Sequence, residues 1–174
     1  MTHRNPRDTE NLSSQSITIR PMEISDVDFI RIGLCEIAWQ DLAEDHKLLV
    51  TRSENDKMIL QDFESRRNDP KRKIDYFVGE LGKISVGFVG IGEFVHPEID
   101  LHFGLIADLW TEPEYRERGI GGLLLDCATK LLKMKGYKRT YLQVSASNPK
   151  AAALYKKKGF YEDHITMIKN NDIC

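Results

Sequence analysis

The stretch PEYRERGIGGLLLD, residues 113–126, joins a cationic, glycine-rich loop directly to a run of leucines. Apolar residues then recur at helical spacing and predict a helix with one apolar face, at Ile120, Leu123, Leu124, Cys127, Ala128, Leu131 and Leu132. Glycines permit close approach of the backbone, and the first turn of a helix carries unpaired N–H groups. Together with Arg116 and Arg118, the loop indicates a site for a phosphate-bearing ligand, with a solvated turn as the alternative.

Two common phosphate-binding motifs do not fit this loop. A P-loop needs a lysine and then a serine or threonine after its last glycine, and no such pair follows here. A dinucleotide-binding turn fits at Gly119 and Gly121, but Leu124 stands where its third glycine belongs. The remaining interpretation is a strand, a loop and a helix, with the amides of residues 117–122 pointing outward.

The composition predicts one ordinary folded domain. The chain has 174 residues, of which 41% are hydrophobic and 30% charged, and the domain is expected over residues 17–174. Residues 1–16 are polar and are expected to form a disordered leader. A net charge of −2 argues against a general nucleic-acid-binding protein.

Cysteine usage and hydropathy favour a cytoplasmic protein without a metal. The three cysteines are scattered and form no C-x-x-C spacing, so neither a zinc site nor a disulfide framework is predicted. No stretch approaches the roughly 20 apolar residues that cross a bilayer, so no membrane association is expected.

The pattern along the chain predicts a mixed α/β domain. Helices are expected from about 26 to 44, from 53 to before 68, from 120, and from 149 to Gly159. Strands are expected over 17–20, 74–80, 84–94, 101–111, 140–145 and 160–168.

A second stretch, SASNPKAAALYKKKGF over residues 145–160, places Asn148 and Tyr155 on one helix face. Taken with Arg116-x-x-Gly119-x-Gly121, it resembles the GNAT family of acetyl-CoA-dependent N-acetyltransferases. The resemblance extends over about residues 17–168. It implies a mostly antiparallel sheet with helices on both faces and a central parallel pair of strands, which splays into a V-shaped cleft for acetyl-CoA.

The resemblance also implies which residues bind the coenzyme. Backbone groups near the end of the strand 101–111 would contact the pantetheine arm, with a bulge freeing one N–H group, and loop amides would hold the pyrophosphate. The implied set is Leu109, Trp110, Thr111, Arg116, Glu117, Arg118, Gly119, Ile120, Gly121, Gly122, Asn148 and Tyr155. Lys156, Lys157 and Lys158 either approach the 3′-phosphate or form a solvated helix end.

The implied reaction is direct attack of a neutral amine on the thioester, with Tyr155 as the general acid. The general base is left open between Asp108, Glu93, His102 and a water molecule. Family members that acetylate the N-terminal alanine of a ribosomal protein carry a glutamate where this chain has Gln143, which weakens the interpretation as a peptide-modifying enzyme.

We therefore expect an acceptor that is a primary amine of a small molecule, such as a polyamine, an aminoglycoside or an amino acid. An acidic set near the first helices suits a cationic amine, namely Glu36, Asp41, Glu44 and Asp45. The alternatives are a protein N-terminal or lysine acetyltransferase and a non-catalytic acyl-CoA-binding module. Homodimerisation is left open.

Overall fold

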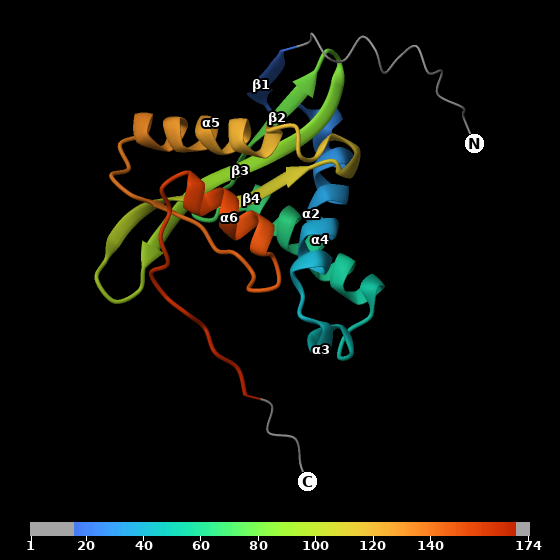
Figure 1. Cartoon of the computed structure of the whole chain (residues 1–174), viewed down its shortest axis with the longest axis vertical. Coiled ribbons are helices and arrows are strands. Elements are labelled where there is room, and N and C mark those ends of the chain that lie inside the picture. Colours follow the sequence, from blue (N-terminus) through green and yellow to red (C-terminus); the bar gives the residue numbers. More distant parts are fainter. Residues whose placement is uncertain (1–15, 170–174) are drawn as a thin grey trace, which may run out of the picture.

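The computed structural model describes residues 16–169, so all but the last residue of the predicted leader lies outside the described residues. One five-stranded sheet has the order β1-β2-β3-β4-β5 (Figure 1). The strands are β1 (Ile17–Pro21), β2 (Asp75–Leu81), β3 (Ile84–His96), β4 (Leu101–Thr111) and β5 (Thr140–Tyr141). Neighbouring strands are antiparallel except β4 and β5, which are parallel.

The helices follow the predicted order with small shifts at their ends. They are η1 (Ile24–Asp26), α2 (Val27–Asp41), α3 (Glu44–Lys47), α4 (Arg52–Asn68), η2 (Pro113–Tyr115), α5 (Ile120–Met134) and α6 (Pro149–Lys157). The first predicted helix ends at Asp41 rather than 44, and α3 follows it. Helix α4 begins at Arg52 because Thr51 caps it, with the Thr51 Oγ1 accepting from the Glu54 amide at 3.2 Å.

Helices cover both faces of the sheet, as predicted. On one face, α2 and α4 enclose a core of Ile30, Leu34, Phe63, Tyr76, Val78, Phe88 and Trp110. On the other face, α5 packs its apolar stripe on β3 and β4, burying Ile120, Leu124, Leu125, Ala128 and Leu132. Side chains alternate between the two faces along a strand, so one sheet supports both cores.

The parallel pair of strands is very short. β5 pairs with β4 only at Gly104 and Leu105, while β4 continues to Thr111 without β5 beside it. On its other side, β4 pairs with β3 through a bulge, because Gly90 opposes Asp108 whereas Ile91 opposes Ile106. Ala107 is the extra residue of this bulge. Because β5 pairs with β4 at only two residues, the predicted splay of the parallel pair is confirmed.

Of the predicted strands, one is shorter than expected and one does not form. The strand predicted over 140–145 ends at Tyr141, because the chain then turns toward α2, where the Ser145 hydroxyl donates to the backbone carbonyl of Asp41 at 2.9 Å. The segment predicted as a strand over 160–168 has no regular structure, and Met167 is 90% exposed. A strand needs a partner for its backbone groups, and β5 is too short to provide one.

Gly33 allows α2 to lie close to the sheet. A Cβ atom at this position would stand 2.4 Å from Cε1 of Phe88 and 2.9 Å from Cδ1 of Trp110. Both rings belong to the buried core between α2 and the sheet, so neither can move aside without disturbing its neighbours. The absence of a side chain at Gly33 thus sets the distance between α2 and the sheet.

We expect Gly33→Ala to destabilise the fold by about 1–3 kcal/mol through overpacking. The measurement is urea unfolding followed by circular dichroism. Gly121→Ala is the matched control, because a Cβ there would meet its nearest atom at 3.6 Å and alanine is favoured in a helix. Equal stability of the two variants would contradict the close packing at Gly33.

Candidate functional site

The glycine loop leads into α5 through two residues with left-handed backbone conformation. Glu117 and Gly119 both have positive φ values, of 64° and 80°, and Gly119 is the N-cap of α5. The first amides of the following helix have no intrahelical partner and carry the positive end of its dipole. Residues 117–122, whose amides were predicted to point outward, therefore span the loop and the first turn of a 15-residue helix.

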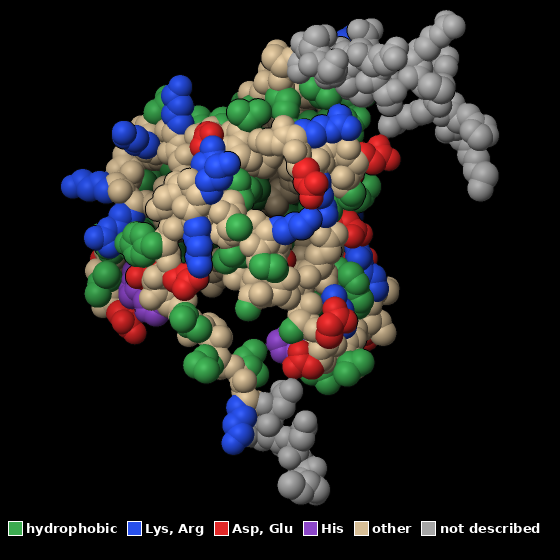
Figure 2. Space-filling view, viewed as in Figure 1, with side chains coloured by type: hydrophobic (Ala, Val, Ile, Leu, Met, Phe, Trp, Pro, Cys, Tyr) green, Lys and Arg blue, Asp and Glu red, His purple; other side chains and the backbone are tan. Residues whose placement is uncertain are grey.

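The protein's own packing does not require a glycine at position 121. A Cβ atom on Gly121 would meet Leu154 at 3.6 Å and the Thr111 hydroxyl at 3.7 Å, which are ordinary contacts. The space beyond it is open to a group from outside. Figure 2 shows the surface hollowed here, over the last part of β4 and between the start of α5 and α6, with basic side chains beside the hollow.

Arg116 is used to hold the loop rather than to extend from it. Its Nε donates to the Thr111 carbonyl at 3.0 Å, and its Nη2 donates to Oε1 of Gln40 on α2 at 3.4 Å. The guanidinium also stacks 4.6 Å above the Trp110 ring. The side chain predicted as a phosphate contact thus ties together the loop, the end of β4 and α2.

The other cations around the loop differ in their surroundings. Arg118 lies over the ring of Tyr115 at 5.3 Å. Of the three lysines at the end of α6, Lys158 lies against the start of α5, with its Cε 3.5 Å from the Cβ position of Gly122 and its Nζ paired with Asp126 at 2.5 Å. Lys156 pairs instead with Glu162.

The last residues of β4 have no neighbouring strand along their outer edge, where Arg116 donates to the Thr111 carbonyl. Leu109, Trp110 and Thr111 have β3 on one side and no strand on the other, since β5 has already separated from β4. Trp110 is only 4% exposed, and its buried indole Nε1 has no hydrogen-bond partner. Unpaired buried donors are uncommon and need an explanation.

The C-terminal end of α2 contacts the segment that leads from β5 to α6. Asp41 accepts a hydrogen bond at its backbone carbonyl from Ser145, and its Oδ1 accepts from Nδ2 of Asn148 at 3.1 Å. Asn148 also caps α6, because its Oδ1 accepts from the Ala151 amide at 3.1 Å. Asn148 therefore has both a capping and a bridging role.

Tyr155 lies half-buried on α6, with Phe160 edge-on at 6.0 Å. Burial, together with the negative charge of Asp41, raises the pKa of Tyr155 to about 12. The phenol is consequently protonated throughout the physiological range.

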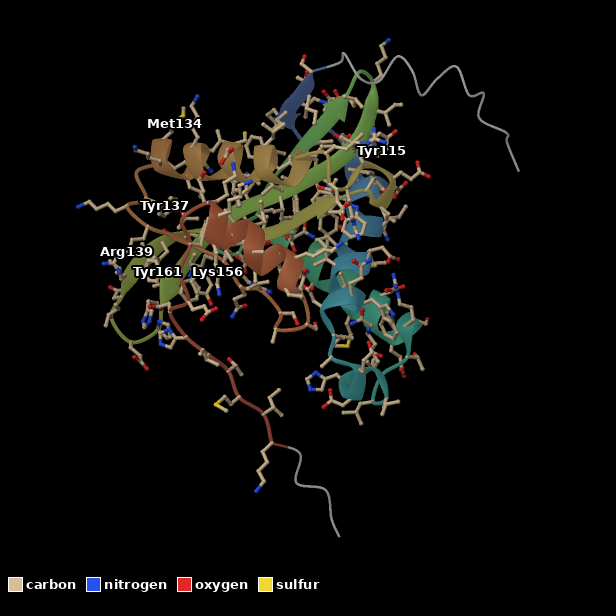
Figure 3. The ribbon with its side chains drawn as sticks, in the orientation of Figure 1. Tyr115, Met134, Tyr137, Arg139, Lys156 and Tyr161 are labelled. Atoms are coloured by element: carbon tan, nitrogen blue, oxygen red, sulfur yellow. The ribbon has the colours of Figure 1, made fainter. Side chains whose placement is uncertain are left out.

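The two candidate carboxylates have opposite environments. Burial raises the pKa of Asp108, whose Oδ2 accepts from the Tyr76 hydroxyl at 2.9 Å. Hydrogen bonds from His102 at 2.9 Å and from the Tyr137 hydroxyl at 3.1 Å instead lower the pKa of Glu93. Figure 3 places Tyr137 on the side of the molecule away from Tyr115, and thus Glu93 and His102 away from the glycine loop.

The predicted acidic set does not act as one group. Glu36 is paired with Arg52 at 2.6 Å, and Glu44 with Lys47 at 2.7 Å. Asp41 is the member that contacts the segment before α6. Sequence reasoning missed Tyr76 and Gln40, because their partners lie 32 and 76 residues away and leave no local pattern.

The acetyltransferase (GNAT) family matches residues 34–160, which include the glycine loop, Asn148 and Tyr155. The chain belongs to the GNAT family. It is 28% identical over 98 residues to the [ribosomal protein bS18]-alanine N-acetyltransferase of Escherichia coli K12, and 30% identical over 91 residues to an uncharacterised N-acetyltransferase of Methanocaldococcus jannaschii. These matches cover 56% and 52% of this chain but only 62% and 40% of the relatives.

Solved structures share this GNAT fold over most of the chain. A putative acetyl transferase from Pyrococcus furiosus superimposes with a TM-score of 0.74 and 23% identity, covering 89% of this chain and 99% of the other. An aminoglycoside N-acetyltransferase in complex with CoA gives a TM-score of 0.64 and 16% identity, covering 91% and 97%. None of the described helices is both long and apolar enough to cross a membrane.

We expect Asn148→Ala to lower the free energy of unfolding by about 1–2 kcal/mol, because α6 loses its cap and its contact with Asp41. Thermal or urea unfolding measures the change. Lys150→Ala is the control on the same helix, since its ion pair with Glu117 is exposed and should add no measurable stability. A cost equal to that of the control would show that neither contact of Asn148 stabilises the fold.

Proposed function

We propose that this GNAT protein is an acetyl-CoA-dependent N-acetyltransferase that modifies a primary amine through a ternary complex. The observation that carries the proposal is the meeting of three features at one hollow. These are the start of α5, the outer edge of β4 that lacks a neighbouring strand, and helix α6, which carries Tyr155. Each feature suits a different part of an acetyl thioester of coenzyme A.

The backbone supplies most of the coenzyme-binding groups in this proposal. Amides of residues 117–122 would hold the pyrophosphate, since a helix N-terminus offers both N–H donors and a favourable dipole. The outer edge at Leu109–Thr111 would pair with the amides of the pantetheine arm and polarise the acetyl carbonyl. The space at Gly121 agrees with a ligand here, and Lys158 is the lysine best placed for a phosphate.

Tyr155 is the proposed general acid. The amine nitrogen forms a bond to the carbonyl carbon, and the carbon–sulfur bond then breaks to release a thiolate. A thiol has a pKa of about 8.5, so the leaving group needs only modest help. A phenol with a pKa of about 12 is a weaker acid than the released thiol, so Tyr155 would assist mainly by donating a hydrogen bond to the thiolate as it forms.

Asp108 is the proposed general base, acting directly or through water. An alkyl ammonium has a pKa of about 10.4, so the acceptor must lose a proton before it attacks. A carboxylate with a raised pKa is a better acceptor of that proton than one with a lowered pKa. This argument favours Asp108 over Glu93.

The proposed acceptor is a small-molecule amine, with the N-terminus of a protein as the second candidate. Likeness to the bS18-alanine enzyme favours the second candidate. Gln143 in place of a glutamate, and the fold shared with an aminoglycoside acetyltransferase, favour the first. A module that only binds acyl-CoA has no need for the protonated Tyr155 beside Asp41.

Acetyl-CoA should bind to the wild type and at least about tenfold more weakly to Gly121→Leu, a difference of about 1.4 kcal/mol. A branched side chain would fill the space in front of the α5 amides, whereas the Cβ position itself is unobstructed. Isothermal titration measures both affinities, and circular dichroism checks that the variant folds. A wild type that does not bind would contradict the proposed coenzyme site.

Turnover is the decisive test of the function. Thiol release from acetyl-CoA should occur with at least one member of a panel of polyamines, aminoglycosides, amino acids and an alanine-first peptide. Tyr155→Phe should lower kcat by about 10²-fold with little change in KM, since only acid catalysis is lost. Tyr161→Phe, at a 76% exposed tyrosine, is the control and should match the wild type. Binding without turnover on every amine would leave the acyl-CoA-binding module.

A further inference from the structure

Tyr76, Gly90 and Asp108 form a row across three strands of the sheet. Tyr76 on β2 is the register partner of Gly90 on β3, and Gly90 is the register partner of Asp108 on β4. Neighbouring strands lie about 4.8 Å apart, so the first and third members are separated by roughly 10 Å of backbone. The Tyr76 hydroxyl nevertheless donates to Oδ2 of Asp108 at 2.9 Å.

The contact exists because the middle position has no side chain. A Cβ atom on Gly90 would stand 2.8 Å from Cε1 of Tyr76 and 3.1 Å from Oδ2 of Asp108. The tyrosine ring crosses above the glycine to reach the carboxylate. The bulge at Ala107 sets the register that brings Asp108 opposite Gly90, so the row depends on this irregularity in β4.

We propose that Tyr76 is a positioning residue that orients the Asp108 carboxylate and stabilises its charged form from across Gly90. The inference rests on the proposed function, in which Asp108 receives the proton of the acceptor amine. Tyr76 is only 7% exposed, and Phe63 and Phe88 hold its ring edge-on at 5.8 and 6.0 Å. Its hydroxyl therefore has a fixed position and contacts Oδ2 of Asp108, while Oδ1 is the atom that would receive the proton in this proposal.

The other charges that act on Asp108 come from α4. Arg66 favours its carboxylate and Asp62 disfavours it, and these two residues are themselves an ion pair. The opposed charges partly cancel, while burial disfavours the carboxylate. The hydrogen bond from Tyr76 is thus the main contact that favours the ionised base. The pKa of Tyr76 is itself raised by burial and by Asp108, so the phenol remains a donor.

The sign of the expected effect follows from this balance. Tyr76→Phe keeps the ring and removes the donor, so the carboxylate loses its stabilising contact and the pKa of Asp108 rises further. Because a base must be ionised to act, the acidic limb of the pH profile of kcat/KM moves to higher pH, by about one unit. Gly90→Ala should act in the same direction by pushing the ring away.

The first experiment compares pH profiles of kcat/KM from pH 5 to 9 for the wild type, Tyr76→Phe and Gly90→Ala. Phe63→Leu is the matched control, because it disturbs the packing of the same ring but retains the hydroxyl. A shifted acidic limb in the first two variants and an unshifted limb in the control would support the proposal. An unshifted limb in Tyr76→Phe, or an equal shift in Phe63→Leu, would overturn it.

A second measurement separates this inference from the proposed function. Carbon-13 NMR of labelled aspartate carboxyls reports the pKa of Asp108 without turnover, with its resonance assigned by its loss in Asp108→Asn. A higher pKa in Tyr76→Phe supports the link between the two residues, and an unchanged pKa overturns it. Asp108→Asn with full activity and an unchanged acidic limb would overturn Asp108 as the base while leaving that link intact.

Discussion

The separation of β5 from β4 after only two paired residues is the constraint on which the rest of the site depends. A longer parallel ladder would satisfy the outer edge of β4 and leave no room beside Leu109–Thr111. The separation is maintained by contacts outside the sheet. The chain after β5 turns to α2, where Asp41 receives hydrogen bonds from Ser145 and Asn148. Backbone groups without a neighbouring strand need another partner, which Arg116 provides for the Thr111 carbonyl and which the proposed coenzyme would provide for others.

Helix α2 links the groups on the two sides of this opening. Gly33 lets it lie against Phe88 and Trp110, Gln40 contacts Arg116 of the glycine loop, and Asp41 holds the segment that leads into α6. The same Asp41 raises the pKa of Tyr155. One helix end therefore influences the glycine loop and the proposed acid together, although the three segments lie far apart in the sequence.

Each proposed catalytic group gains its protonation behaviour from its surroundings. Tyr155 is kept protonated by burial and by a nearby negative charge, whereas Asp108 is made more basic by burial and is kept ionisable by the Tyr76 hydroxyl. Tyr155 packs against the core on the α5 side of the sheet, whereas Tyr76, the partner of Asp108, belongs to the core on the α2 and α4 side. A thioester lying along β4 would lie between the proposed acid and the proposed base.

The sequence by itself determined the features that depend on neighbouring residues. Helix periodicity predicted α5, Asn148 before Pro149 predicted the cap of α6, and the spacing of Gly119, Gly121, Asn148 and Tyr155 indicated the family. It failed where a residue's partner is distant. The strands predicted over 140–145 and 160–168 have suitable residues but little or no pairing. Only the tertiary structure could distinguish the surroundings of Asp108 from those of Glu93, because Asp108 is buried and the Tyr76 hydroxyl reaches it across the glycine at position 90.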